Sequence, residues 1–194
     1  PDGNFLVTSM QENALHGWKL DIKPGTEARH MRMTGYPSKV KSLSWSVKGK
    51  WLASSGAPAA IVWPFQGKDG PMGKEPAMLA PMQARASAVA CHPKHDIMAV
   101  GYGDGTVLMV RLEDGAEILV RRRGNAAVAG LAWSAKGALL AKRGFRVLHE
   151  LGIGHVRFVC TMPYGRITIL CSAIVIALSA CGQKGPLTLP PPVA

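Results

Sequence analysis

The sequence has few of the features that mark an enzyme or a metalloprotein. Its four cysteines, Cys91, Cys160, Cys171 and Cys181, form no C-x-x-C pair, and no histidine stands at metal-ligand spacing from them. No serine lies in a G-x-S-x-G motif. We therefore predict no catalytic residues, no metal site and no cofactor, and we expect Cys91 to be a small buried hydrophobic residue.

Long apolar runs and acidic residues are also scarce. The longest apolar stretch, ITILCSAIVIALSA, has fourteen residues (167–180). As a helix it would reach about 21 Å, which is short of the roughly 30 Å hydrocarbon layer of a membrane. Asp and Glu number 12 against 23 Lys and Arg, which gives a net charge of +11. This balance attracts anions without specificity, and nucleic-acid binding is not favoured on this ground alone.

The hydrophobic content of 47% excludes wholesale disorder, and a repeat organises most of the chain. The first residue is proline, which we interpret as a fragment or a processed product. Each repeat begins with a similar turn, at offsets of 46, 46 and 42 residues, in the segments PDGNFLV (1–7), VKGKWLA (47–53), PKHDIMA (93–99) and AKGALLA (135–141). The last three segments follow the short apolar strands LSWS, VACH and LAWS.

After each of the first three turns the sequence predicts a second, a third and a fourth strand. Asp104-Gly105 separates two β-rich runs and predicts a type I′ hairpin, in which both residues have positive φ. GYGDGT is interpreted as this hairpin rather than a phosphate loop, because it lacks G-x-G-x-x-G spacing and no helix is expected after it. Four short strands in each forty-odd residues are typical of a propeller blade.

These repeats resemble the WD40 family over residues 1–141. Trp18 and Trp63 fall where that family has a tryptophan at the end of the third strand, and Val110 takes the place in the next unit. The dipeptides Trp18-Lys19, Trp63-Pro64 and Val110-Arg111 lack the family's aspartate, and no Gly-His pair opens a blade. Thr8 and Ser54 fit the family's second-strand hydroxyl, whereas His30 fits its histidine poorly.

The resemblance implies an all-β fold, with a partial WD40-like propeller of about three to three and a half four-stranded blades. It also implies a non-enzymatic cytoplasmic scaffold that binds other proteins through the propeller surface. A ring needs about four to eight blades, so we expect either blades before Pro1 or a join of two unrelated coding segments. His92 and His95 flank Pro93 and are expected to be solvated or capping residues.

A run of arginines, 121–123, falls on an outermost strand, where positive charge opposes edge-to-edge pairing. Its alternative role is to hold nucleic acid or an acidic partner. Beyond Ala141 the blade pattern stops, and residues 142–161 are predicted to be an irregular junction.

Residues 162–180 have the three regions of a secretory signal peptide: a basic start (MPYGR), the apolar stretch, and small residues before a cysteine. We expect a short helix over Ile167–Leu178, although a buried strand or helix of a core is the alternative. Leu178, Ser179, Ala180 and Cys181 resemble the bacterial lipobox. This resemblance implies cleavage between Ala180 and Cys181, lipid attachment to Cys181, and membrane anchoring through that lipid.

Residues 181–194 begin CGQKGPLTLPPP, which resembles the mature start of the small lipoprotein that accompanies the lipopolysaccharide translocon of the outer membrane. The resemblance implies an outer-membrane location and contact with the translocon. The three prolines 190–192 favour an extended, disordered tail. We interpret the polypeptide as a composite, or frame-shifted, product: a WD40-like scaffold joined to a lipoprotein that starts at Met162. The alternative function is that of the lipoprotein, assisting assembly of the translocon.

Overall fold

Residues 3–144 and 157–161 are described by the computed structural model. The signal-type helix predicted for Ile167–Leu178, the lipobox and the proline-rich tail all lie outside these residues. The described residues form four β-sheets and one short 3-10 turn, η1 (Glu27–Arg29), without an α-helix. The predicted all-β class is therefore confirmed for this part of the chain.

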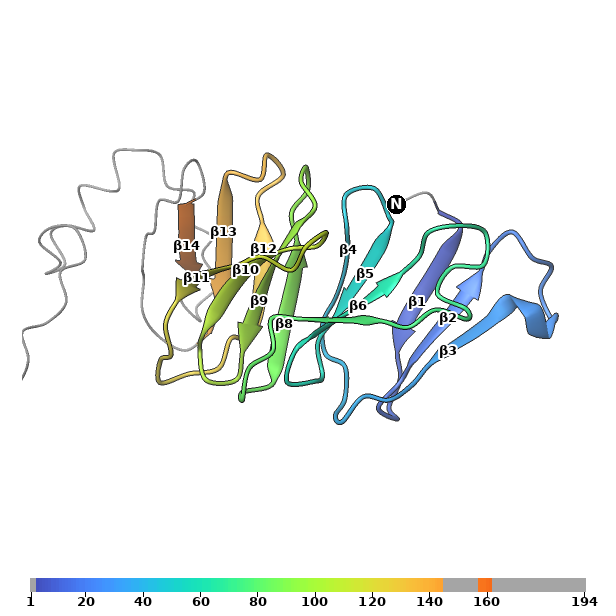
Figure 1. The fold of residues 1–194 in the computed structure, drawn as a ribbon, viewed down its shortest axis with the longest axis horizontal. Coiled ribbons are helices and arrows are strands. Elements are labelled where there is room, and N and C mark those ends of the chain that lie inside the picture. The colour runs from blue at the N-terminus through green and yellow to red at the C-terminus, as the bar shows by residue number, and fades with distance from the viewer. Residues whose placement is uncertain (1–2, 145–156, 162–194) are drawn as a thin grey trace, which may run out of the picture. The chain divides into compact units, whose positions relative to one another are not determined.

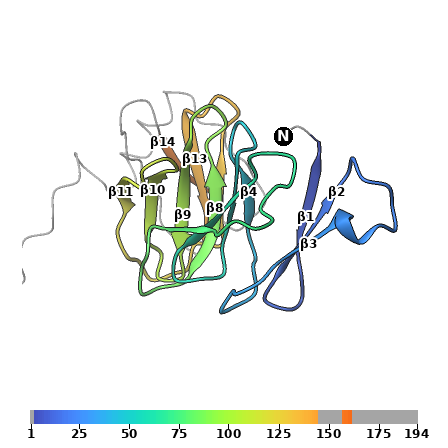
Figure 2. The same ribbon diagram turned by 45° about the vertical axis from the view of Figure 1, so that its right-hand side comes forward.

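The sheets follow one another along the sequence (Figure 1). The first contains β1 (Phe5–Ser9), β2 (Leu15–Lys19) and β3 (His30–Met33), and the second contains β4 (Leu43–Trp45), β5 (Trp51–Ser54), β6 (Ala60–Pro64) and β7 (Ala77–Leu79). The third contains β8 (Ala86–Cys91), β9 (Ile97–Tyr102), β10 (Val107–Arg111) and β11 (Glu117–Arg121), and the fourth contains β12 (Gly130–Trp133), β13 (Leu139–Arg143) and β14 (Arg157–Thr161). Within the first three sheets, consecutive strands pair antiparallel (Figure 2).

In the second, third and fourth sheets the repeated turns join the first and second strands, as predicted. In the second and fourth sheets a glycine closes the turn: the amide of Gly49 donates to the carbonyl of Ser46, and that of Gly137 to Ser134. Both glycines have positive φ, +66° and +76°, a conformation in which a Cβ would be strained. The third sheet has no glycine here, and the imidazole of His92 organises the turn instead.

Each sheet buries both of its faces where it has a neighbour on both sides. Successive residues of a strand point to opposite faces, so Leu52 enters the cluster shared with the first sheet while Ala53 enters the cluster shared with the third. Met98 and Ala99 divide in the same way between the second and fourth sheets. Strands buried on both faces become almost continuously apolar, as in β6 and β10.

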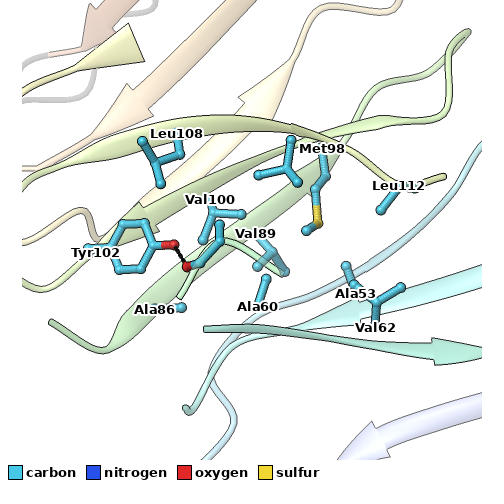
Figure 3. Close-up of a cluster of buried hydrophobic side chains, with 12 residues drawn as sticks. Ala53, Ala60, Val62, Ala86, Val89, Met98, Val100, Tyr102, Leu108 and Leu112 are labelled. Atoms are coloured by element: carbon cyan, nitrogen blue, oxygen red, sulfur yellow. Dashed lines mark hydrogen bonds between the residues drawn. The ribbon is translucent and has the colours of Figure 1, made fainter. Parts of the chain in front are cut away.

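The cluster between the second and third sheets is the largest of the three (Figure 3). Val62 and Ala53 meet Val89, Met98 and Val100, all of them 3% exposed or less. Burying one such branched or long side chain stabilises the fold by about 1.5–3 kcal/mol. The phenol of Tyr102 closes one end of the cluster and donates to the carbonyl of Ala80.

The hairpin between β9 and β10 differs from the predicted type I′ turn. Gly105 has φ +89°, but Asp104 does not have positive φ. The loop holds three residues, because the amide of Tyr102 donates to the carbonyl of Thr106 and the amide of Gly105 donates back to Tyr102. The Asp104 carboxylate explains the difference: its Oδ1 accepts the Thr106 amide at 3.0 Å, which fixes an Asx turn.

The junction 142–161 is not irregular throughout, and that part of the prediction is wrong. β13 continues to Arg143, and β14 pairs with it in parallel, with Leu139 opposite Arg157. A parallel partner needs a connection far longer than a hairpin. The repeat pattern predicts a hairpin partner directly after β13, whereas β14 follows β13 only after the thirteen residues 144–156 and so lies outside that pattern.

Candidate functional site: an indole relay and the surfaces of the sheets

The second sheet contains a buried relay of three polar side chains. Trp63 donates from Nε1 to the hydroxyl of Tyr36 at 2.6 Å, and that hydroxyl lies 2.7 Å from Ser54 Oγ. Ser54 Oγ in turn donates to the carbonyl of Ile61 at 3.1 Å. Because the serine has one proton, Tyr36 must donate to Ser54, and the relay has a single direction. Its buried polar atoms are thus satisfied within the chain.

Burial changes the pKa of Tyr36, the central residue of the relay. Desolvation raises the pKa of the Tyr36 phenol, while the contacts with Ser54 and Trp63 act in the opposite direction. The phenol therefore stays protonated at physiological pH and keeps its donor role toward Ser54. The relay is a structural device that holds the β3–β4 connection against the second sheet.

The corresponding positions of the third sheet are apolar. Val110 stands in the place of Trp63, and Val100 in the place of Ser54; both are fully buried. Met82, which corresponds to Tyr36 in the repeat, packs against the same cluster. Replacing every partner of a polar network by apolar groups leaves no buried donor without an acceptor. The second sheet therefore fills these positions with hydrogen-bonded polar side chains, and the third sheet fills them with apolar side chains.

In the first sheet the repeat residues are only partly covered. Trp18 pairs across the strands with Leu6 and His30, as Trp63 pairs with Leu52. Its indole is half-buried and stacks on His16 at 4.2 Å between ring centroids. His30 contacts His16, with 3.0 Å between Nδ1 and Nε2, and takes no part in a relay. The prediction that His30 fits the family's histidine poorly agrees with this geometry.

Tyr36 was not predicted, although a signal was available. A buried tryptophan and a buried hydroxyl at fixed repeat positions need a third polar partner, and only His30 was considered for it. Tyr36 lies in the connection after β3, three residues beyond Met33. The hydroxyl of Tyr36 in that connection, ahead of the next strand, is the signal for the third partner.

Neighbouring sheets are also joined by side chains that bind backbone groups. Ser42 Oγ accepts the amide of Val89 at 3.0 Å, and Ser44 Oγ accepts the amide of Cys91 at 2.8 Å. β4 and β8 accordingly lie side by side in both views (Figures 1 and 2). The indole of Trp133 donates to the carbonyl of Ala90 at 2.9 Å and so links the third and fourth sheets.

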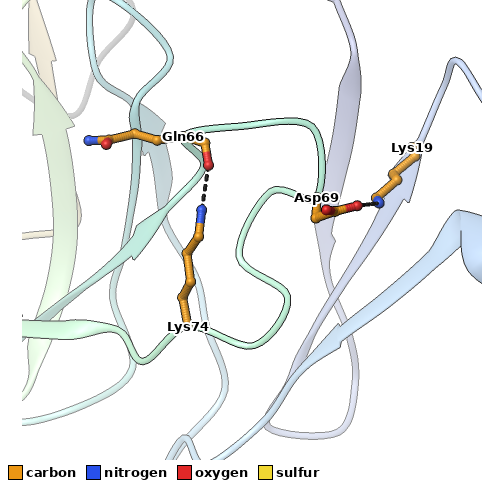
Figure 4. Close-up of polar contacts among 4 residues, drawn as sticks. All are labelled: Lys19, Gln66, Asp69 and Lys74. Carbon is orange, nitrogen blue, oxygen red and sulfur yellow. Dashed lines mark hydrogen bonds and ion pairs between the residues drawn. The ribbon is translucent and has the colours of Figure 1, made fainter.

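The connection between β6 and β7 is held by two lysines (Figure 4). Lys19, almost fully buried, donates to Asp69 Oδ1 at 2.7 Å and so joins the first sheet to this connection. The hydrogen bond from Lys19, followed by its charge, lowers the pKa of Asp69. Lys74 donates to the carbonyl of Gln66 within the connection itself. These contacts position a surface loop and create no cluster of reactive groups.

Two groups that could do chemistry are held in inert forms. Cys91 is partly buried rather than fully buried as predicted, and desolvation raises the pKa of its thiol to about 12, so almost no thiolate exists at neutral pH. His92 accepts the amides of Lys94 and His95 at Nδ1 and donates from Nε2 to the carbonyl of Gly137 at 3.1 Å. The capping role predicted for the turn histidines is thus confirmed for His92. Residues 3–144 and 157–161 contain no group of three or more potential metal ligands.

Three of the six large apolar side chains that are exposed in the described residues stand on the outermost strands of two neighbouring sheets. Met78 on β7 is 62% exposed, and Ile118 and Leu119 on β11 are 49% and 51% exposed. The turn before β11 lies close to β7, since a Cβ on Gly115 would be 3.4 Å from Leu79 Cδ2. We name these three exposed residues the outer-strand surface. Arg121 is the last residue of β11, and Arg122 and Arg123 follow the strand, so the arginine run lies only in part on the outermost strand where it was predicted.

The lipobox Leu178, Ser179, Ala180 and Cys181 lies outside the described residues, so its predicted roles stay predictions. No helix within 3–144 and 157–161 has the length and hydrophobicity needed to cross a membrane. Of the predicted repeat residues, Trp63 is buried in the relay and Trp18 is half-exposed. Asp104 and Gly105 shape the three-residue turn and have no further contact with a reactive group.

Comparisons with known proteins support both halves of the sequence interpretation. Residues 29–63 match the model of the WD domain, G-beta repeat, and residues 168–190 match the conserved region of the LPS-assembly lipoprotein LptM. The curated proteins give no match. A chain in the crystal structure of a mitotic checkpoint complex is similar, with a TM-score of 0.59 and 21% identity. The alignment covers 74% of this chain and 42% of that chain.

The matched WD repeat is the segment that contains the whole relay of Tyr36, Ser54 and Trp63. The described part of the chain therefore has the fold of a WD40 propeller segment, and the C-terminal part contains a region of the LptM lipoprotein type.

Proposed function

We propose that the WD40-like part of the chain is a non-enzymatic scaffold that binds other proteins. The observation that carries this proposal is the outer-strand surface on a WD40 fold. Ile118 and Leu119 are neighbours in β11 and point to opposite faces of the strand, and they are 49% and 51% exposed, so both faces of this outermost strand are open to a partner. Apolar side chains left exposed on outermost strands are available for contact with another protein.

Charge beside this surface narrows the kind of partner. Arg121 is half-buried at the end of β11, and Arg122 and Arg123 follow it exposed. A partner that meets the outer-strand surface with apolar side chains and has carboxylates at its rim would match both features. Nucleic acid is a weaker candidate, because the apolar residues beside the arginines include no aromatic ring on which a base could stack.

Photo-crosslinking in cells tests this proposal. The full chain is produced with benzoylphenylalanine in place of Met78 or Ile118, and, as the control, in place of Lys48, which is exposed in the β4–β5 turn. We expect one protein to be crosslinked from both outer-strand positions and not from Lys48, and we expect Leu119→Lys to abolish it. Equal crosslinking from all three positions, or crosslinking unaffected by Leu119→Lys, would contradict the proposal.

We infer a second function for residues 162–194, that of a lipid-anchored component of the outer membrane. The match of 168–190 to a lipoprotein region supports it, together with Leu178-Ser179-Ala180 directly before Cys181. The thiol of Cys181 would receive a diacylglyceryl group, and the segment would assist assembly of the lipopolysaccharide translocon. Two or more acyl chains give stable anchoring, at about 0.8 kcal/mol for each buried methylene.

The same proposal includes a composite origin for the polypeptide. Export recognises an apolar run close to the start of an unfolded chain, so the lipoprotein is expected to be translated from Met162 while the WD40-like part stays in the cytoplasm. Metabolic labelling with palmitate should mark a small product, and Cys181→Ala should remove the label whereas Cys171→Ala should not. A single labelled species that also contains the SLSWS peptide would show instead that both parts are exported together.

A further inference from the structure

One lysine stands at the same position in three of the repeated turns. The turns between the first and second strands of the second, third and fourth sheets have the sequences SVKGK (46–50), HPKHD (92–96) and SAKGA (134–138). In each turn the central lysine comes two residues after the side chain that caps the turn. We name these three lysines, all of them exposed, the lysine row: Lys48, Lys94 and Lys136.

The cap of each turn fixes the backbone from which the lysine extends. Ser46 Oγ accepts the amide of Trp51 at 3.1 Å, and the serine at the same position of the fourth sheet caps its turn in the same way. In the third sheet His92 Nδ1 accepts the amide of Lys94 itself at 3.0 Å. The turns are therefore ordered before a partner binds, which lowers the entropic cost of binding.

The three turns are also neighbours in space. β8 contacts both β4 and β12, and Ser44 Oγ accepts the amide of Cys91 at 2.8 Å, directly before the turn of the third sheet. His92 Nε2 donates to the carbonyl of Gly137 at 3.1 Å and so joins the turns of the third and fourth sheets. Sheets that stack face to face lie about 10 Å apart. The three lysines therefore follow one another at about that spacing.

The positive charge of the lysine row is not neutralised within the described residues. None of the three lysines forms an ion pair with a carboxylate there. The three turns contain four lysines and one acidic residue, Asp96, which has one carboxylate oxygen buried. Further carboxylates at this end of the sheets, such as Asp69 and Asp114, stand in the connections that lead into the outermost strands β7 and β11. Positive charge without a partner attracts an acidic molecule.

The lysine row lies at the ends of strands, and not on the face or the edge of a sheet. A sheet stacked on either side would cover a face and would leave the turns open. The row is also separate from the outer-strand surface and its arginines. The turn of the third sheet precedes Ile97, whereas Arg121 lies opposite Val107, at the other end of that sheet. The three turns contain no exposed large apolar side chain, so charge is the feature that a partner recognises here.

We propose that the lysine row binds an extended acidic segment of another protein, which crosses the three turns and places one carboxylate beside each lysine. An extended chain advances about 3.1–3.4 Å per residue, so three residues span about the distance between stacked sheets. The segment therefore has an acidic residue at every third position. A polypeptide is favoured over nucleic acid, because the turns contain no Phe, Tyr or Trp for stacking on a base and no arginine for two-point binding of phosphate. This binding extends the proposed scaffold function to a second partner.

A peptide of defined spacing tests the proposal. A fluorescein-labelled peptide in which Glu-Pro-Pro is repeated three times is titrated with the full chain at physiological ionic strength, and binding is followed by fluorescence anisotropy. We expect saturable binding. Lys48→Gln, Lys94→Gln and Lys136→Gln combined should weaken it by about 3–150-fold, the product of three surface ion pairs of about 0.2–1 kcal/mol each. The control removes the same charge from three lysines that are exposed elsewhere and should change binding less than about twofold. It combines Lys23→Gln, Lys41→Gln and Lys68→Gln.

Two further probes separate spacing and chemical class from net charge. A peptide with its three glutamates next to one another should bind more weakly, because its carboxylates reach fewer turns at once. Circular dichroism confirms that each variant is folded. Absence of peptide binding, equal loss in the two triple variants, or equal binding of the two peptides would overturn the proposal. Binding of a labelled oligothymidylate, and not of the peptide, through the lysine row would also overturn it. None of these outcomes bears on the crosslinks from Met78 and Ile118, for which Lys48 remains a control because the partner proposed here is a different protein.

Discussion

The relay of the second sheet makes the sharpest stability prediction. Tyr36→Phe removes the hydroxyl that accepts the Trp63 indole and donates to Ser54. Ser54 keeps its bond to the carbonyl of Ile61, so the principal loss is the orphaned indole N–H. A buried donor without an acceptor costs about 1–3 kcal/mol. We expect the free energy of unfolding to fall by that amount.

A double-mutant cycle isolates the relay from the packing of the rings. Trp63→Phe alone removes the donor and creates a cavity, so its own cost is large. In that background no indole remains to be orphaned, and Tyr36→Phe should cost less than about 1 kcal/mol. The coupling energy between Tyr36 and Trp63 is therefore expected to be about 1–2 kcal/mol.

Urea unfolding of the full chain, followed by far-UV circular dichroism, gives the four free energies of the cycle. Equal slopes for the four variants are required, since a changed slope indicates a changed unfolded state or an intermediate. If Tyr36→Phe has the same cost with tryptophan and with phenylalanine at position 63, the indole is not coupled to the phenol. The directed relay would then be refuted.

Three other predictions concern single groups. Gly105→Ala should destabilise the fold by more than about 1 kcal/mol, because Gly105 has φ +89° and a Cβ there would be 2.7 Å from the carbonyl oxygen of Ala126. Gly103→Ala should destabilise the fold less, because a Cβ at Gly103 would have its nearest neighbouring atom at 3.8 Å. Thermal melting of both variants measures the difference. Burial lowers the pKa of His92, so the unfolded state binds more protons than the folded state. The free energy of unfolding should therefore fall as the pH drops below about 6.5. His92→Asn, which keeps a hydrogen-bond acceptor, should flatten this pH dependence in urea unfolding measured at several pH values. Peptide mapping after iodoacetamide treatment at pH 7 should find Cys91 unmodified in the folded chain and modified in urea, because its pKa is about 12.

The recurring features of the fold could be predicted from the sequence because they depend on local chemistry. The glycine turns at Gly49 and Gly137 and the alternation of apolar residues require only a short window of sequence. The blades of a partial propeller could be predicted from the spacing of these turns and strands along the sequence. The position of Trp63 at the end of the third strand followed in the same way.

What could not be predicted depends on partners distant in the sequence or on competing local bonds. β14 is recognisable only from its parallel pairing with β13. The Asp104 carboxylate binds a backbone amide and displaces the type I′ turn that the dipeptide favours. Tyr36 joins the relay across 27 residues from Trp63, and its role is visible only when both are placed on the same sheet. The partners on the outer-strand surface depend on molecules outside the chain.

The serine contacts between β4 and β8 have a consequence for hydrogen exchange. The amides of Val89 and Cys91 are bonded to hydroxyls of the neighbouring sheet and not to a strand of their own. Their protons can exchange with solvent when the two sheets separate, even if every ladder stays intact. Comparing their exchange rates with that of Ala90, which faces β9, therefore distinguishes parting of adjacent blades from unfolding of a blade.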